Sequence, residues 1–369
     1  MMQIIFFAVS TVTLLASHAL FWYIFIRFFH IVSVYGRIAA ALVLFFLFLN
    51  AIVSSYIIHK WDNIFTRYYY ILSVFWIGLS FNLCLAAALI AVLKLADWSF
   101  GFYLPDLYLK TIFVATASLL TLIGLYRAWL PQVKEYTVTI KDLPESWQNK
   151  TIVQLSDVHL GAIYRKKFFY RLIDKINDLD PAAVFITGDL FDGMDAEFSW
   201  LNHPFARLNA PQGIYYSFGN HDLYLGFNRV IDLLKENPVK ILDNSMAVVD
   251  GLQIIGISYS FNSDFNLEAE ILKQINYSAA KPSILLLHAP KNIDLAKKAG
   301  IDLQLSGHTH DGQLWPFNYI VSWAHKGYGY GFFHEGDFSL VVTSGAGSWG
   351  PPIRTAARSE IVKITLRRK

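Results

Sequence analysis

The sequence predicts four membrane-spanning helices followed by an α/β domain. The first observation behind this fold class is the distribution of charge. Residues 1–129 hold three acidic and seven basic side chains, whereas residues 130–369 hold 25 acidic and 24 basic ones. The second is a series of β-rich apolar runs, several alternating with helix-like segments, after residue 150. The chain therefore divides into a membrane part at 1–129, a linker with a first strand at 130–150 and a folded domain at 151–369.

Four apolar stretches account for the membrane part. Each reaches the roughly 20 residues that an α-helix needs to cross about 30 Å of hydrocarbon. They cover residues 3–26, 38–58, 68–93 and 107–125. A cleavable signal peptide does not fit, because no basic segment precedes the first stretch and three more stretches follow it. Basic residues at the ends of the spans divide equally between the two sides, so the positive-inside rule gives no orientation. Cys84, the only cysteine, lies in the third stretch, and the folded domain has no disulfide.

The folded domain shows buried strands separated by helical segments. Helix-like patterns occupy 164–179, 226–236 and 291–299. The strands are near-continuous apolar runs, which is typical of a sheet covered by helices on both faces. These runs are TIVQLSD, AAVFITGD, GIYYSFGN, SILLLH, IDLQLSGH, SLVVTSG and EIVKITL.

Five of these runs end in residues that bind metals. In chain order the ends carry Asp157 and His159, then Asp189 and Asp192, then Asn220, His221 and Asp222, then His288, and finally His308 and His310. Taken singly, an Asp at a strand end is usually a cap or turn residue, and a lone His is usually a core residue. Five of the eight histidines after residue 130 stand at such ends, however, and α/β sheets bind ligands at the carboxyl ends of their strands. We expect His203, His325 and His334 to lie outside this site.

The order of these residues resembles the calcineurin-like metallophosphoesterase superfamily. That family carries D-x-H, G-D-x-x-D, G-N-H-[DE], a single His and G-H-x-H, and the chain has DVH, GDLFD, GNHD, His288 and GHTH in that order. Five blocks in sequence are a specific signal, whereas one would be weak. GHTHDGQLWP and GSWGPPIRTAARSEIVKITL resemble a bacterial, membrane-linked branch with transmembrane members. The resemblance implies an α/β sandwich with central sheets flanked by helices. Asp311 and Ser359 depart from that branch at positions that are not ligands.

The resemblance implies a two-metal phosphoesterase. Two divalent ions about 3.5–4 Å apart neutralise the phosphoryl oxygens and lower the pKa of a bridging water. Asp189 would bridge the ions, and mixed oxygen and nitrogen ligands suit Mn, Fe or Zn. The first ion would add Asp157, His159 and His310, and the second would add Asn220, His288 and His308. Because side chains alternate along an extended segment, His308 and His310 are expected to point to the same side.

Two further residues have implied catalytic roles. His221 is not a ligand in the family pattern and would bind the phosphoryl group or protonate the leaving oxygen. Asp192 would orient the His221 imidazole through its carboxylate. Asp222 is expected only to support the turn.

Several functions and partners stay open. The leading hypothesis is hydrolysis of a phosphate ester or pyrophosphate bond in a lipid-linked substrate, for which the resemblance offers a UDP-diacylglucosamine-type precursor. The alternatives are a tethered phosphodiesterase for a soluble nucleotide-like substrate and a non-catalytic scaffold or sensor. The aromatic segment 314–333 is either a packed loop or a lip that meets lipid. We expect a bilayer partner, no nucleic acid, and a multi-pass location in a bacterial inner or plasma membrane. The domain is expected on the cytoplasmic side, because nothing in the sequence announces export.

Overall fold

The computed structural model describes residues 2–101, 103–194, 196–261 and 265–369. The chain forms two compact units. One unit comprises Met1–Tyr126 with Gly350–Ile353, and the other comprises Arg127–Trp349 with Arg354–Lys369.

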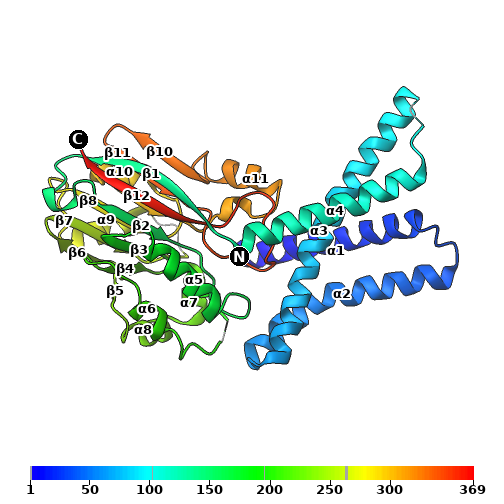
Figure 1. The fold of residues 1–369 in the computed structure, drawn as a ribbon, viewed down its shortest axis with the longest axis horizontal. Coiled ribbons are helices and arrows are strands. Elements are labelled where there is room, and N and C mark those ends of the chain that lie inside the picture. The colour runs from blue at the N-terminus through cyan, green and yellow to red at the C-terminus, as the bar shows by residue number, and fades with distance from the viewer. Residues whose placement is uncertain (1, 102, 195, 262–264) are drawn as a thin grey trace. The chain divides into compact units, whose positions relative to one another are not determined.

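The first unit is built from long apolar helices (Figure 1). They are α1 (Met2–Phe28), α2 (Val34–Lys60), α3 (Ile64–Phe100) and α4 (Asp106–Trp129). Helices α2, α3 and α4 are each long and apolar enough to cross a bilayer. In α1 the apolar stretch found among the described residues is the shorter segment Leu15–Phe28. Three long spans and one shorter apolar segment thus stand where the sequence predicts four, as in a multi-pass membrane protein.

The helices of this unit pack through small and aromatic residues. Phe21 of α1, Leu44 of α2, Ala86 of α3 and Phe113 of α4 belong to one buried cluster. Polar side chains also join the helices, as Asn82 Nδ2 donates to Thr121 Oγ1 at 3.0 Å in the interior. Small residues and buried hydrogen bonds are how helices associate where lipid, rather than water, is the solvent.

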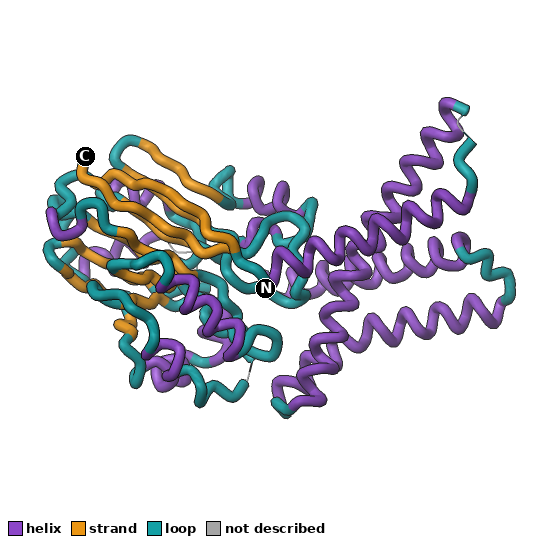
Figure 2. The backbone as a smooth tube through the Cα atoms, in the orientation of Figure 1, coloured by secondary structure: helices purple, strands orange, loops and turns teal. Residues whose placement is uncertain are grey.

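The second unit is a sandwich of two mixed six-stranded sheets, drawn in orange in Figure 2. The first sheet has the order β1-β12-β2-β3-β4-β5 and the second β10-β11-β9-β8-β7-β6. The strands of the first sheet are β1 (Gln132–Ile140), β12 (Glu360–Arg368), β2 (Thr151–Leu155), β3 (Ala183–Thr187), β4 (Ile214–Ser217) and β5 (Val239–Ile241). Those of the second are β10 (Gly331–Glu335), β11 (Phe338–Val342), β9 (Leu303–Ser306), β8 (Ser283–Leu287), β7 (Leu252–Ile257) and β6 (Ser245–Val249).

Apolar side chains of both sheets meet in one core. Ile152 and Phe185 of the first sheet share a buried cluster with Ile254, Leu286 and Leu305 of the second. The outer face of the second sheet packs on α9 (Phe265–Gln274) and α10 (Ile293–Ala299). The remaining helices are α5 (Lys166–Asn177), α6 (Asn202–Ala206), α7 (Asn220–Leu225), α8 (Phe227–Leu234) and α11 (Phe317–Ala324), with short 3-10 turns at Glu145–Trp147 and His310–Gly312.

One sequence expectation is corrected by this topology. The apolar runs alone indicated one sheet covered by helices on both faces, but β2, β3 and β4 lie in the first sheet and β8 and β9 in the second, as in the sandwich that the family resemblance implies. A buried apolar run looks the same in either sheet, because periodicity reports burial and not the pairing partner. The candidate site therefore forms where the carboxyl ends of both sheets meet.

Candidate metal centre

The metal-type residues follow directly on the strands, as the sequence predicts. Their backbone leaves the extended region at once, and five of them have positive φ: Asp157, His159, Asp189, His308 and His310, at 50° to 71°. Asp and His tolerate this left-handed region better than most residues, although it costs about 1–2 kcal/mol per residue. Such strain persists only where the surrounding structure enforces it, and it clusters at functional sites.

The first group of donor atoms comes from Asp157, His159 and His310, all of which are buried. Their ligand atoms lie within 4.8 Å of one another. The Nε2 atoms of the two imidazoles are 3.0 Å apart, and Nε2 of His310 is 3.5 Å from Asp157 Oδ1. The Asp157 carboxylate also accepts the backbone N–H of His308 at 3.0 Å, which ties the β2 exit to the β9 exit.

The second group comes from Asp189, His288 and His308, again with ligand atoms within 4.8 Å of one another. The Nδ1–H of His288 donates to the backbone carbonyl of Thr187 at 2.7 Å, which leaves Nε2 facing Asp189 Oδ2 at 3.1 Å. Asn220 begins α7 beside this group, because the next residue, His221, donates its backbone N–H to Asp189 Oδ1 at 2.8 Å.

The segment that carries His308 and His310 is not extended, contrary to the expectation from side-chain alternation. β9 ends at Ser306, and both histidines lie in a tight turn with positive φ. The turn sends His310 to the first group and His308 to the second. One segment thus reaches both groups, but through left-handed backbone rather than through strand alternation.

The histidines of the site differ in pKa because their charged neighbours differ. Burial lowers the pKa of His308 to about 3, and burial together with the Arg354 charge holds the pKa of His310 well below its usual range. Burial alone would also lower the pKa of His288, but the Asp189 carboxylate outweighs it and raises that pKa to about 9. His159 has a raised pKa because the Asp192 carboxylate offsets its burial. A metal ligand must be deprotonated, so His308 and His310 are ready as ligands at neutral pH, whereas His288 has to release a proton.

His221 and Asp192 lie next to both groups, with one difference from the sequence expectation. The Nδ1–H of His221 donates to the backbone carbonyl of Asp192 at 2.9 Å, whereas the carboxylate of Asp192 lies 3.2 Å from Nδ1 of His159. Asp192 therefore orients the His221 ring through its main-chain carbonyl, and its carboxylate interacts with the His159 ring. The sequence motif placed Asp192 near His221, but a sequence cannot show whether the main-chain carbonyl or the carboxylate of Asp192 faces the His221 imidazole.

Asp222 supports the turn, as expected. Its buried carboxylate accepts the backbone N–H groups of Asp189 at 2.7 Å, Gly219 at 2.8 Å and Phe191 at 3.0 Å. These bonds join the β3 and β4 exits. Burial, with the nearby Asp189 charge, raises the pKa of Asp222 to about 7.

Arg354 is a site residue that sequence reasoning did not single out. Its side chain is fully buried, and Nη2 donates to His310 Nδ1 at 2.7 Å and to the Ser344 carbonyl at 2.8 Å. Nε donates to the Gly347 carbonyl at 2.9 Å. The available signal was an arginine, one of two, inside a Gly- and Pro-rich segment between two buried strands, and nothing in that segment pointed to a histidine 44 residues earlier.

The donor set fits a pair of metal ions. The Asn220 Oδ1 atom is buried without a hydrogen-bond partner, and His288 Nε2 lies 3.1 Å from Asp189 Oδ2 as an ion pair. An unsatisfied buried acceptor costs free energy, and a cation beside Asn220 Oδ1 and the Asp189 carboxylate would satisfy that acceptor and take the place of the His288 proton. His203, His325 and His334 belong to none of the metal-type groups found among the described residues.

The chain is similar in sequence to known metallophosphoesterases. The family model for calcineurin-like phosphoesterases matches residues 150–312. An uncharacterized metallophosphoesterase of Campylobacter jejuni is 36% identical over 273 residues, covering 72% of this chain and 72% of the relative. A transmembrane protein with metallophosphoesterase domain from Danio rerio is 32% identical and covers 64% of this chain and 57% of that protein. Among solved structures, a dimetal phosphatase from Danio rerio matches with a TM-score of 0.35 at 13% identity, covering 54% of this chain and 88% of its own.

Proposed function

Because this chain belongs to the calcineurin-like metallophosphoesterases, we propose that it is a membrane-embedded two-metal enzyme that hydrolyses a phosphate ester or pyrophosphate bond in a lipid-linked substrate. Membership makes it a metal-dependent phosphoesterase. The observation that carries the two-metal proposal is the convergence of buried Asp, Asn and His donors from five strand ends and two sheets. A scaffold or sensor would not need such a set of strained, desolvated ligands.

In this proposal each residue of the site has a defined task. Asp157, His159, Asp189, Asn220, His288, His308 and His310 hold two ions, taken from Mn, Fe or Zn. The ions, when bound, neutralise the phosphoryl oxygens and supply an activated water. The Asp222 carboxylate accepts hydrogen bonds from three backbone N–H groups, and these bonds fix the loop after β3 that carries Asp189.

His221 is the proposed general acid. Its Nδ1–H is committed to the Asp192 carbonyl, so Nε2 is the nitrogen free to hold or release a proton. The side chain is partly exposed, whereas Asp157, His159 and His288 are buried. A general acid must reach the leaving oxygen of a substrate that enters the site from outside the protein.

Two features support a lipid-linked substrate over a soluble one. The chain carries long apolar helices in residues 1–129, four of which we propose as spans. In addition, α11 begins seven residues after His310 and buries none of its side chains, with Trp323 83% and Tyr319 65% exposed. Trp and Tyr are favoured at the membrane interface, where their rings are half in lipid and half in water. We propose that α11 meets the bilayer and that the catalytic unit, residues 151–369, lies on the cytoplasmic side of it.

The test is a triple replacement of Trp315, Phe317 and Trp323 by Ser, assayed in vesicles and in solution. We expect slower turnover of a long-chain lipid-linked phosphate and nearly unchanged hydrolysis of a small chromogenic phosphodiester. Equal losses of turnover on both substrates would mean that these side chains only stabilise the fold. No loss on either substrate would mean that they do not contact the substrate. Labelling of a cysteine placed at the exposed Ser199 in intact cells checks the proposed side of the membrane.

A further inference from the structure

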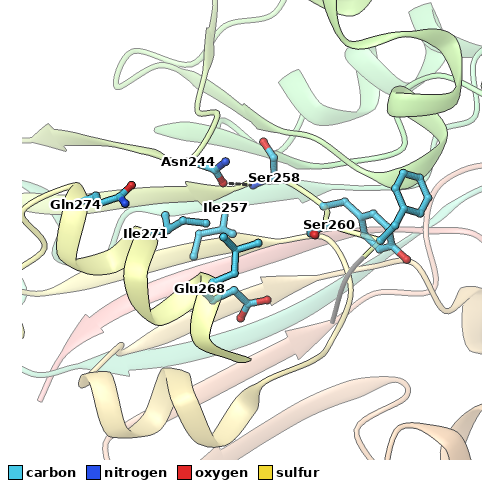
Figure 3. A pocket seen from close by; sticks show the side chains of 10 residues that line it. Asn244, Ile257, Ser258, Ser260, Glu268, Ile271 and Gln274 are labelled. Carbon is cyan, nitrogen blue, oxygen red and sulfur yellow. Dashed lines mark hydrogen bonds between the residues drawn. The ribbon is translucent and has the colours of Figure 1, made fainter. Parts of the chain in front are cut away.

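A pocket of about 520 Å³ lies beside the candidate metal centre, between α9 and the loop that follows β7 (Figure 3). Its volume falls in the range of small-molecule sites. One part of its lining is apolar and aromatic, made by Ile257, Tyr259, Phe261, Leu267 and Ile271. Another part is polar, made by Asn244, Ser258, Ser260, Glu268 and Gln274.

Tyr259 belongs both to this pocket and to the surroundings of the second metal group. Its ring centroid lies 5.7 Å from that of His308 and 6.0 Å from that of His288. Phe261 follows at 5.3 Å from Tyr259, and Tyr224 at 5.7 Å from Phe261. Tyr224 in turn lies 5.2 Å from His221. A continuous row of aromatic rings therefore connects the proposed acid and the proposed metal ligands with the lining of the pocket.

The lining indicates what kind of group fits. Phe261 is 45% exposed, and an exposed aromatic face offers stacking to a flat ring. The lining residue Glu268 is buried, and its carboxylate is 3.4 Å from Nζ of Lys291, which lies 5.4 Å from the centre of the Tyr259 ring. A plain alkyl chain would cover these polar groups without hydrogen-bonding them, which costs free energy. A ring with hydrogen-bonding edges would use both the aromatic face and the polar lining.

We propose that this pocket binds a ring-bearing group attached to the substrate phosphate, either a nucleobase or a sugar ring, with Phe261 and Tyr259 as the stacking surface. The inference rests on the proposed function, because a phosphate held at the metal centre brings the attached group to Tyr259. It adds a recognition site for the part of the substrate that is neither phosphate nor lipid.

The experiment measures binding rather than turnover. The full chain in detergent, loaded with Mn²⁺, is titrated by calorimetry with inorganic phosphate, hexyl phosphate, thymidine 5′-monophosphate and glucose 1-phosphate. We expect at least one ring-bearing phosphate to bind about tenfold or more tightly than inorganic phosphate, as the loss or gain of one stack is worth about 1–3 kcal/mol. Comparing the affinities for thymidine 5′-monophosphate and glucose 1-phosphate shows whether the pocket prefers a nucleobase or a sugar ring. Tightest binding of hexyl phosphate would overturn the proposal in favour of an alkyl site.

Pocket variants then test whether the tighter binding of ring-bearing phosphates, relative to inorganic phosphate, comes from this pocket. Phe261→Ala removes the stacking face and Leu267→Trp fills the opening, and each should bring the ring-bearing phosphates down to the affinity of inorganic phosphate. Phe261→Tyr should keep the advantage. Val248→Ser, at an exposed apolar position on β6, is the matched control and should change nothing. If the advantage survives both pocket variants, or never appears although inorganic phosphate binds, the pocket proposal is wrong and the proposed function stands. If inorganic phosphate does not bind to the loaded protein, both fall.

Discussion

His310 and His288, one in each metal group, are both buried but have opposite surroundings. His310 accepts a hydrogen bond from the Arg354 guanidinium, and its pKa lies well below the usual range because of burial and that charge. His288 donates to a main-chain carbonyl and faces the Asp189 carboxylate, which raises its pKa to about 9. One imidazole is therefore neutral before any metal arrives, and the other forms an ion pair that a metal must replace.

This difference shows that the two halves of the site depend on different parts of the chain. The first group is held by the charged side chains of Arg354 and Asp192, which a mutation can remove. The second depends on the Thr187 carbonyl for the orientation of His288, and no side-chain substitution deletes a carbonyl. Asp189 reaches both groups, because its carboxylate lies 3.1 Å from His288 Nε2 and within 4.8 Å of a donor nitrogen of His159.

The largest effect is expected from Asp189→Ala, which removes the one residue proposed to serve both ions. Metal content should fall from two ions per chain to below one, and hydrolysis should fall by more than the roughly 10⁴-fold upper limit for losing a general acid. Elemental analysis and rates on a chromogenic phosphodiester measure both. Asp174→Ala, which breaks an exposed pair with Arg207, is the control and should keep both values. Retention of two ions in Asp189→Ala would refute the bridging role.

His221→Ala should separate catalysis from metal binding. We expect two ions to remain, while turnover of an ester with a poor leaving group falls about 10²–10⁴-fold. A p-nitrophenyl ester, whose leaving group needs no proton, should lose less. One nitrogen of His221 lies within 4.8 Å of donor atoms of His159 and Asp189. Loss of an ion in this variant would therefore make His221 a ligand and not the acid.

The gathering of these Asp, Asn and His side chains at one place could be predicted from the sequence, because each follows a buried apolar run and the strand ends meet there; their role as ligands stays a prediction. The partition over two sheets could not, since β2 and β8 are both short, mostly apolar and almost wholly buried strands. Neither could Arg354, the Asp192 carboxylate beside His159, or the aromatic surface formed by Tyr259, Phe261 and Tyr224. These contacts join loops that are far apart in the sequence, and no local period or spacing encodes them.

Arg354→Met tests the side-chain support of the first group. The variant leaves the Ser344 and Gly347 carbonyls and His310 Nδ1 buried without their donor, so unfolding of the catalytic unit should become easier by about 2–4 kcal/mol. Arg354→Lys should recover only part of this, because an ammonium cannot reproduce the planar fork. Denaturant unfolding in detergent measures the loss. A change below about 0.5 kcal/mol, the range of ordinary surface substitutions, would show that these bonds contribute little.

The smallest effect is a pH dependence expected from the second group in metal-free protein. The pKa of His288 rises from about 6.5 in the unfolded chain to about 9 in the folded one. Its stabilisation is therefore complete below about pH 6.5 and is lost as the pH rises through about 9, on the order of 1–3 kcal/mol. The partner Asp189 has a lowered pKa, because His288 outweighs its burial, so its contribution is lost only in acid.

Thermal unfolding of the chelator-treated protein between pH 6 and pH 9.5 should show this loss, and His288→Gln should flatten the curve over that interval. Loading the protein with metal should flatten it as well, since the ion takes the place of the proton. His310 offers the internal contrast with the opposite sign. Its imidazole is neutral in the folded protein and takes up a proton only on unfolding, so its destabilising effect disappears as the pH rises through about 6.5, before His288 begins to lose its proton. If His288→Gln melts with the same pH dependence as the parent chain, the His288–Asp189 ion pair is not its source, and the proposed difference between the two halves of the site fails.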